Sequence, residues 1–232
     1  MSDTPVIPLS KIPNFDPRKA AVVGVDSHLP AVAAVSLEAS ALRRRFAQPP
    51  QWKSDSVLER RFTNRHPTNA AVLVAIVQRE QPTILLTERT AHLSTHSGQV
   101  AFPGGKVDEG DADAAATALR EAHEEVGLQG SFVQVIGQLP VYTTGTAFVV
   151  TPVVALVQPG FELQPNPGEV ADVFEVPLAF LMNPANHHRH EMEWDGVHRE
   201  WFSMPWNDGR KEHFIWGATA GMLRNFYRFL SA

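Results

Sequence analysis

The order of hydrophobic and polar positions along the chain predicts a domain rich in strands that begins near residue 66. Residues 70–77 and 83–87 are runs of apolar and β-branched side chains, separated by a short polar segment that contains Pro82. Such runs are typical of buried strands, and the short connection favours a hairpin. The same criteria predict further strands at residues 100–102, 132–139, 148–157, 189–193 and 197–204, and Asp195-Gly196 suits a tight turn between the last two.

Two segments of this region have the period of an amphipathic helix. Small apolar residues recur on one face between residues 114 and 126, and Gly127 follows where a left-handed residue commonly ends a helix, covered by Leu128. A second helix is predicted at residues 218–230. Its inward face is expected to carry Leu223, Phe226, Tyr227 and Leu230. Strands flanked by helices predict an α/β protein.

Residues 1–65 differ from the remainder. Prolines interrupt the first 30 positions, and a helix is expected only at residues 37–47, begun by Ser36 and ended by two prolines. The segment carries too little apolar material for a core of its own. The sequence therefore predicts an N-terminal extension over residues 1–65, which lies against a main domain at residues 66–232 or against a partner subunit.

Composition excludes several classes of protein. The chain has 232 residues, 44% of them hydrophobic, as in an ordinary globular protein. Its formal charge of −5 is the wrong sign for a general binder of phosphate backbones, so nucleic acid is not an expected partner. It has no cysteine for a disulfide or a thiolate site. No apolar run approaches the length of a membrane span, and the expected location is the cytoplasm.

An arginine cluster and a histidine cluster are both predicted to be structural rather than functional. Arg43, Arg44 and Arg45 are predicted to form the solvated face of the N-terminal helix. The spacing of His187, His188 and His190 puts successive side chains on different faces, and no acidic anchor lies at a suitable offset. A polar loop is therefore predicted there rather than a metal site. 

Three acidic residues carry the strongest chemical signal. Glu121, Glu124 and Glu125 are three and four positions apart, so on a helix they project within an arc of roughly 60°. Like charges at this spacing destabilise a helix by about 0.2–0.5 kcal/mol per pair unless a cation joins them. Hard oxygen ligands suit Mg²⁺ or Mn²⁺. The sequence predicts a divalent metal site, and the alternative is a solvated acidic face.

The segment that contains these glutamates resembles the signature of the Nudix hydrolases, G-x5-E-x7-R-E-U-x-E-E-x-G-U, in which U is a bulky aliphatic residue. The match over residues 120–128 is complete except that Ala122 stands at the first U. In the N-terminal half, Asp111 stands for the first acid, and one extra residue separates it from Arg120. In the family this acid supports the loop. Alternatively, Asp111 or Asp113 caps the helix.

The resemblance implies a Nudix-type α/β/α sandwich around a mixed β-sheet, with residues 66–232 as the hydrolase domain. We assign Glu121 and Glu125, one turn apart, as the main metal ligands, and expect Glu124 to share a second ion or to position a water. A backbone carbonyl of Gly104 or Gly105 is expected to complete the shell, because glycine permits close approach. 

Two further catalytic residues are expected. Arg120 is predicted to pair with one carboxylate and fix its rotamer, and the alternative is a surface partner of Glu124. Family members often take a general base from a loop outside the helix, and residues 166–173 are the candidate loop. Glu169 follows a Pro-Gly turn in this loop and is predicted to act as the base or as a metal ligand. The alternative is an exposed glutamate in a turn.

A second pattern narrows the resemblance. Residues 85–105 are similar to the extra motif of the coenzyme A diphosphatase branch, L-L-T-x-R-[SA]-x3-R-x3-G-x3-F-P-G-G, with the same spacing. Thr90 replaces the small residue, and Ser94 and Ser97 stand where basic residues are expected. The candidate substrate contacts are Arg89, His96 and Gly104. His96 alternatively bonds to a backbone carbonyl.

The resemblance implies that the protein uses Mg²⁺ or Mn²⁺ to hydrolyse the diphosphate bond of coenzyme A or acyl-coenzyme A, yielding 3′,5′-ADP and 4′-phosphopantetheine or its acyl form. One alternative keeps the chemistry but acts on ADP-ribose, a dinucleotide or a nucleoside triphosphate. An alternative from another class is a non-catalytic regulator that binds a nucleotide. The three retained glutamates favour catalysis. A homodimer is expected from family habit alone.

Overall fold

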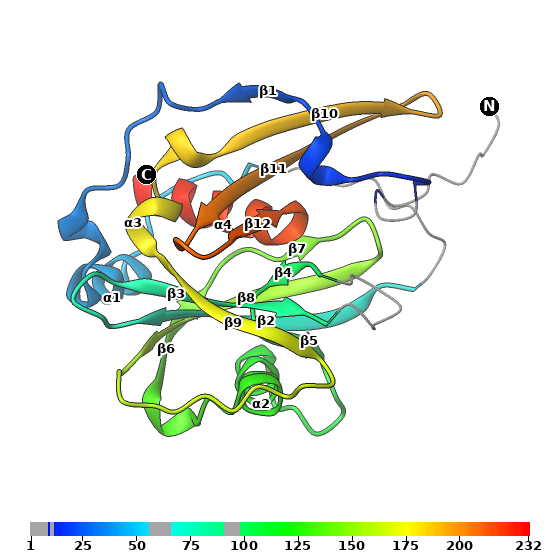
Figure 1. Cartoon of the computed structure of the whole chain (residues 1–232). Coiled ribbons are helices and arrows are strands. Elements are labelled where there is room, and N and C mark those ends of the chain that lie inside the picture. The colour runs from blue at the N-terminus through cyan, green and yellow to red at the C-terminus, as the bar shows by residue number, and fades with distance from the viewer. Residues whose placement is uncertain (1–8, 10–11, 56–65, 91–97) are drawn as a thin grey trace.

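A mixed β-sheet forms the centre of the molecule, a computed structural model in which residues 9, 12–55, 66–90 and 98–232 are described (Figure 1). Within these residues the sheet has eight strands: β2 (Thr68–Val77), β3 (Thr83–Arg89), β4 (Val100–Ala101), β5 (Gly104–Lys106), β6 (Val133–Gln138), β7 (Tyr142–Thr143), β8 (Phe148–Val157) and β9 (Val170–Pro177). Strands β2 and β8 run parallel along their whole length, whereas the other neighbours are antiparallel. The mixed sheet predicted from the sequence is therefore confirmed.

A smaller antiparallel sheet lies apart from the central one (Figure 1). In the described part of the chain it consists of β1 (Val22–Val25), β10 (His188–Trp194), β11 (Val197–Asn207) and β12 (Glu212–Trp216), in that order. The β10–β11 hairpin was predicted, and its turn residues Asp195 and Gly196 both have positive φ, 53° and 69°. The expected tight turn is thus present. The sequence patterns of β1 and β12 were too short to predict them.

Helices cover both faces of the central sheet. They are α1 (Ala39–Ala47), α2 (Ala114–Val126), α3 (Leu178–Leu181) and α4 (Gly217–Ser231), with 3₁₀ turns η2 (Pro17–Lys19), η3 (Ala34–Leu37), η4 (Gly130–Phe132) and η5 (Pro184–Asn186). Figure 1 shows α2 on one face and α4 on the other, between the two sheets. The α/β/α arrangement is confirmed. No helix in the described ranges has the length and apolar content that a bilayer crossing requires.

The alternation of side chains along β2 divides the hydrophobic core into two parts. The odd-numbered side chains pack with α2, and the even-numbered ones pack with α4 and the smaller sheet. The first set is Ala71, Leu73, Ala75 and Val77, and the second is Ala70, Val74 and Ile76. Because consecutive side chains of a strand point to opposite faces, one apolar run supplies both cores. The continuous hydrophobicity of β2 and β8 follows from this position.

Helix α2 begins and ends as its sequence predicts. The Asp113 side chain accepts a hydrogen bond from the N–H of Ala116, which makes Asp113 the N-cap. At the other end Gly127 has φ 72°, and its N–H donates to the carbonyls of Ala122 and His123. Leu128 follows and is buried. These contacts form a left-handed C-terminal cap, so both ends of the glutamate-bearing helix are specified locally.

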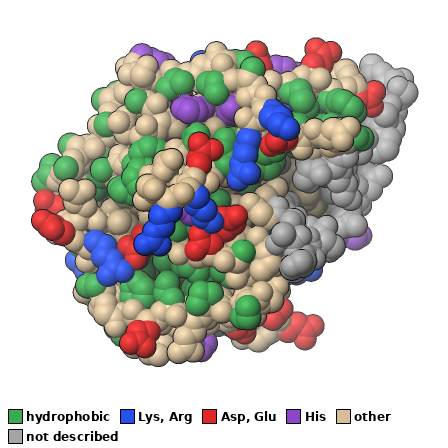
Figure 2. Space-filling view, in the orientation of Figure 1, with side chains coloured by type: hydrophobic (Ala, Val, Ile, Leu, Met, Phe, Trp, Pro, Cys, Tyr) green, Lys and Arg blue, Asp and Glu red, His purple; other side chains and the backbone are tan. Residues whose placement is uncertain are grey.

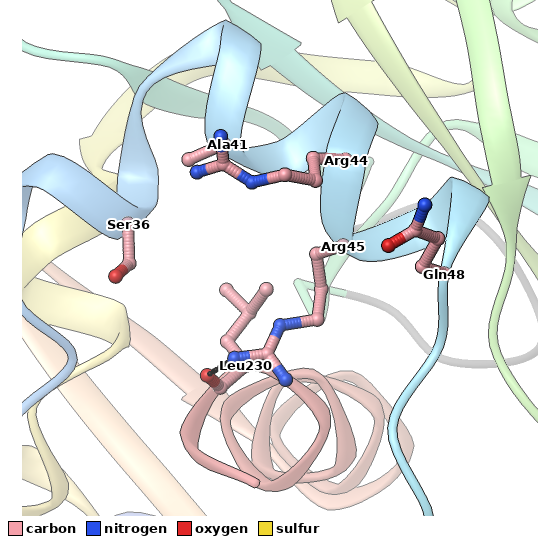
Figure 3. Close-up of a pocket in the computed structure, with 6 residues that line it drawn as sticks. All are labelled: Ser36, Ala41, Arg44, Arg45, Gln48 and Leu230. Atoms are coloured by element: carbon pink, nitrogen blue, oxygen red, sulfur yellow. Dashed lines mark hydrogen bonds between the residues drawn. The ribbon is translucent and has the colours of Figure 1, made fainter.

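The N-terminal helix begins two residues later than predicted. Ser36 lies inside the turn η3, and Glu38 is the residue before the helix, without a side-chain cap. Figure 3 shows Arg45 extending from α1 over the end of α4. Its guanidinium donates to the carbonyls of Leu230 and Ala232, at 3.1 and 2.7 Å. Arg45 is therefore not part of a solvated face, whereas Arg43 and Arg44 are exposed.

The polar loop predicted around the three histidines is wrong. His187 is fully buried, and its Nε2 lies 2.7 Å from the carbonyl of Leu181. His190 lies in β10, also buried, with Nε2 2.8 Å from the hydroxyl of Ser203. Each ring finds partners that come from other elements, which offset the cost of burial. Burial lowers the pKa of His187 to about 4, so its ring is neutral at pH 7.

Candidate functional site

The glutamates of α2 pack against the backbone of β5. The N–H of Gly104 donates to Oε2 of Glu125 over 3.1 Å. The carboxylate of Glu121 lies so close to Gly105 that a Cβ at that position would overlap its carbon and both oxygens. A side chain at position 105 would therefore displace the Glu121 carboxylate, and glycine leaves that space to it. Two sequence-predicted ligands thus adjoin the two predicted glycines.

Glu125 is a buried carboxylate with little compensation. Its side chain is 5% exposed, and Oε1 lies 3.4 Å from Nη1 of Arg89. Burial raises the pKa of Glu125 to about 7, although the Gly104 N–H and Arg89 lower it, and the nearby charges of Glu121 and Glu169 add to the rise. Burial also raises the pKa of Glu121. The site holds more negative charge than its own cations offset.

Arg120 bonds to three carboxylates rather than the one predicted. Its Nη1 lies 2.9 Å from Oε1 of Glu121 and 3.0 Å from Oε2 of Glu124, while Nη2 lies 2.8 Å from Oδ2 of Asp111. Asp111 also accepts hydrogen bonds from the N–H of Asp108 and from the hydroxyl of Thr117. Asp111 therefore holds the loop between β5 and α2 in place.

The candidate loop predicted at residues 166–173 is shorter than expected, because β9 begins at Val170, and the part that precedes β9 reaches the same site. The N–H of Asn166 donates to the carbonyl of Glu125 over 2.8 Å, which ties the loop to the end of α2. The Asn166 side chain accepts from the N–H of Gly168 and donates to Oε1 of Glu169 over 3.4 Å. The charge of Glu169 contributes to the raised pKa values of Glu121 and Glu125. Glu169 is thus a close neighbour of the helix glutamates.

Thr90 has a role that the sequence pattern did not show. Its N–H donates to the carbonyl of Glu169 over 3.0 Å, and its hydroxyl donates to the carbonyl of Gly168 over 3.3 Å. These bonds connect the end of β3 to the loop. The one feature of the sequence that could have indicated this role is the position of Thr90 beside Arg89 in the upstream motif. The predicted substrate contact His96, together with Ser94 and Ser97, lies outside the described residues.

The residues of the site fit a divalent cation. Four glutamates, at 121, 124, 125 and 169, adjoin two guanidinium groups, and Arg120 also neutralises Asp111. Carboxylate oxygens are the ligands that hard divalent ions prefer. The side chains are spread, however, with the guanidinium of Arg120 between Glu121 and Glu124. In the described ranges, two groups of three bring ligand atoms within 4.8 Å, and the α2 glutamates belong to neither.

A protein-family model described as "NUDIX domain" matches residues 67–202. The chain belongs to the Nudix family. Proteins named "Uncharacterized Nudix hydrolase NudL" are similar to it. The one from Shigella flexneri serotype 5b (strain 8401) is 47% identical over 165 residues, which are 69% of this chain and 83% of that protein. The one from Enterobacter sp. (strain 638) is 46% identical over 156 residues, 67% of this chain and 79% of that protein.

Solved structures of Nudix proteins also resemble the chain. The MutT/nudix family protein from Enterococcus faecalis aligns with 82% of this chain and 74% of its own, at 15% identity and a TM-score of 0.44. Membership of the family and the relatives named NudL make the protein a Nudix hydrolase that acts on diphosphate bonds. Nudix hydrolases use divalent metal ions and take small nucleotide-containing substrates.

Proposed function

We propose that this Nudix hydrolase cleaves the diphosphate bond of coenzyme A or acyl-coenzyme A with Mg²⁺ or Mn²⁺. The oxygen of a water molecule adds to one phosphorus, and the bridging P–O bond breaks. The products are 3′,5′-ADP and 4′-phosphopantetheine or its acyl form. The single observation that supports hydrolysis is the buried carboxylate of Glu125 held against β5 with its pKa raised to about 7. The upstream motif at residues 85–105 supports the substrate.

The proposed ligands of the ion are the glutamates of α2. Glu121 and Glu125 would hold it, and the backbone of Gly105 approaches Glu121 closely. Glu124, with a side chain 56% exposed, holds a second ion or positions a water. When bound, the ion neutralises the diphosphate oxygens, orients the attacking water and stabilises the leaving phosphate. Arg120 positions Glu121 and Glu124 through its hydrogen bonds.

Glu169 is the proposed general base. It stands on a loop that Asn166 and Thr90 fasten to α2 and β3, so its carboxylate is placed beside the helix glutamates without belonging to the helix. A base on a separate element can approach the water from another side than the ligands do. Removing the carboxylate in Glu169→Gln should lower kcat with little change in KM.

Arg89 is the proposed ligand of a substrate phosphate. Its guanidinium lies beside Glu125, at the edge of the acidic site, with a side chain 28% exposed. Guanidinium groups bind phosphate through two parallel hydrogen bonds, which an ammonium cannot do. Arg89→Lys should therefore raise KM for a diphosphate substrate. His96 and Gly104 complete the proposed substrate contacts.

A comparison of substrates tests the proposal directly. Turnover of coenzyme A, an acyl-coenzyme A, ADP-ribose, a dinucleotide and a nucleoside triphosphate would be measured with Mg²⁺ and with Mn²⁺. We expect the highest kcat/KM for coenzyme A or its acyl form. Equal or better turnover of ADP-ribose would reject the coenzyme A proposal while retaining the hydrolase. Nucleotide binding without turnover of any compound would instead indicate a regulator.

The extension and the oligomeric state belong to the same proposal. We propose that residues 1–65 are an extension that wraps the hydrolase domain at residues 66–232. Its contacts support this, because β1 pairs with β10 and the hydroxyl of Tyr227 donates to the carbonyl of Pro30. We also propose a homodimer. Size-exclusion chromatography with light scattering on the full chain should give twice the 25.6 kDa monomer mass.

A further inference from the structure

A second cluster of ligand-type side chains lies apart from the α2 glutamates. Glu88 of β3 stands opposite Asp172 of β9 in the strand register, and a ring nitrogen of His213 of β12 lies within 4.8 Å of a carboxylate oxygen of each. Figure 2 shows acidic and basic side chains gathered on this face, between the positions of β9 and β12 in Figure 1. Arg89, the neighbour of Glu88, contacts Glu125 instead. The two adjacent residues thus serve different sites.

A single ammonium group presently joins the two carboxylates. Nζ of Lys211 lies 2.8 Å from Oε2 of Glu88 and 2.9 Å from Oδ2 of Asp172. Asp208 adds a third carboxylate to the same cluster, 3.1 Å from the ring of His213. Two carboxylates therefore contact the ammonium of Lys211, and the third, Asp208, contacts the ring of His213 and the backbone N–H of Lys211. This arrangement binds a cation already, and a doubly charged ion would offset more of the negative charge.

His213 supplies the observation that goes beyond an ion-pair network. Its side chain is 0% exposed and stacks on Phe174, with ring centroids 3.6 Å apart. Nε2 bonds to Oδ2 of Asp208, and Nδ1 is buried without a hydrogen-bond partner among the described residues. Nδ1 lies 4.0 Å from Oε2 of Glu88. A buried nitrogen without a hydrogen bond lowers the stability of the fold, and a bound ion at Nδ1 would offset that cost.

The hydrogen bond to Asp208 determines which ring nitrogen can bind an ion. A carboxylate accepts a hydrogen bond, so Nε2 carries the proton and Nδ1 of the neutral ring has the lone pair. This lone pair belongs to the nitrogen nearer Glu88. A carboxylate that orients the far nitrogen of a metal-bound histidine is a common feature of metal sites. Asp208 would act here as the positioning residue.

We propose that Glu88, Asp172 and His213 bind a transition-metal ion of the Zn²⁺ type, which takes the place of the Lys211 ammonium. The three ligand atoms lie within 4.8 Å of one another. One imidazole nitrogen and two carboxylate oxygens suit Zn²⁺, whereas Mg²⁺ prefers oxygen ligands and retained waters. The ion would fasten the β11–β12 hairpin to β3 and β9. This site does not depend on the proposed substrate.

Zinc titration of the full chain tests the site. Isothermal titration with ZnCl₂ would be performed in excess MgCl₂, which keeps the α2 glutamates supplied with a divalent ion. We expect one Zn²⁺ per chain in the wild type. Lys211→Met removes the competing ammonium and should tighten binding roughly tenfold, whereas Asp172→Asn removes a ligand and should weaken it by about tenfold or more. His213→Gln should abolish it.

A matched control is present on the hairpin of the smaller sheet. His198 belongs to a second group with Glu191 and Glu200, but all three are exposed and the ring has no oriented, buried lone pair. His198→Gln should leave the Zn²⁺ affinity unchanged. If His198→Gln weakened binding instead, or Lys211→Met left it unaltered, the ion would not occupy the proposed position and the proposal would be overturned.

Diffraction supplies a test that does not depend on the folding of variants. A wild-type crystal soaked in ZnCl₂ should show an anomalous peak between Glu88, Asp172 and His213, with the Lys211 ammonium displaced. Equal Zn²⁺ affinity in Asp172→Asn and the wild type, or an anomalous peak only among the α2 glutamates, would reject the site. Either result would leave the hydrolase proposal intact.

Discussion

On the α4 side of the central sheet, Arg224 is buried together with acceptors for its charge. Nη2 lies 2.8 Å from Oδ2 of Asp26, and Nε lies 2.8 Å from Oδ2 of Asp55, while Nη1 bonds to Nδ1 of the neutral His187. The guanidinium also lies over the ring of Tyr227. Asp26 and Asp55 come from the N-terminal segment, so this matched charge fastens that segment to α4.

On the α2 side, Glu125 is buried to a similar degree but without a matching set of cations. Arg89 is its nearest cation, at 3.4 Å, and Glu121 and Glu169 lie close by with the same charge. The raised pKa of Glu125 records this imbalance. Buried charge that is matched holds the structure together, whereas buried charge that is left unmatched is available for a ligand of opposite sign. 

The largest effect should come from removing the unmatched charge. Glu125→Gln keeps an oxygen that can accept from Gly104, so the fold should persist, but turnover should fall roughly 10³-fold because a ligand of the ion is lost. Steady-state kinetics at saturating Mg²⁺ measure the change. Glu109→Gln, at an exposed position between β5 and α2, is the matched control and should stay near wild-type rates. Near-normal turnover of Glu125→Gln would show that the ligand assignment is wrong.

Removing the matched charge should affect stability rather than chemistry. Arg224→Met leaves the buried Asp26 with only the half-exposed Arg189, 3.3 Å away, and the free energy of unfolding should fall by about 3–5 kcal/mol. Urea titration followed by circular dichroism measures it. Arg228→Met is the control, because Arg228 also contacts Asp55 but is 38% exposed, and it should cost less than about 1 kcal/mol. If Arg224→Met and Arg228→Met lowered the free energy of unfolding equally, burial of the Arg224 ion pairs would not add to their stabilising effect.

Acidity should alter the stability of the metal-free protein through Glu125. Its folded-state pKa of about 7 exceeds the ordinary glutamate pKa of 4.5, so between these values the folded state binds more protons than the unfolded state. Unfolding free energy should therefore fall as pH rises from about 4.5 to 7, by roughly 3 kcal/mol in total.

The same linkage predicts how the ion acts. Mg²⁺ should raise the melting temperature more at pH 8, where Glu125 is ionised in both states, than at pH 5. Differential scanning fluorimetry with EDTA or MgCl₂ would measure both series. In Glu125→Gln the fall in stability between pH 4.5 and 7 should shrink. An unchanged pH profile in that variant would assign the effect to another group.

The smallest effect concerns the glycine beneath Glu121. Gly105→Ala places a Cβ where the carboxylate lies, so Glu121 must move, and we expect Mg²⁺ activation to require about 10 to 100 times more metal. Gly110→Ala is the control in the same connection, since nothing lies within 4 Å of its added Cβ. Indistinguishable Mg²⁺ titration curves for the two variants would remove Gly105 from the site.

The sequence alone predicted the glutamate-bearing helix and the strands β2, β3, β6 and β8 of the central sheet, but not β9, part of which was assigned to a loop. The N-cap at Asp113, the left-handed Gly127 and the spacing of the glutamates all act within one helix, so a local pattern records them. Residues 148–157 were likewise predicted with the boundaries that β8 has. Short strands such as β5 and β7 escaped prediction because two or three residues carry no period.

The pairing of charged side chains depends on the tertiary structure. Arg224 meets Asp55 across 169 positions of sequence, and Lys211 meets Glu88 across 123. The burial of His187 and the proximity of Glu169 to Glu125 likewise depend on which strands pair. Charge and burial act through space, and a single sequence orders residues only along the chain. The helix could therefore be predicted from the sequence, whereas the environment that raises the pKa of Glu125 could not.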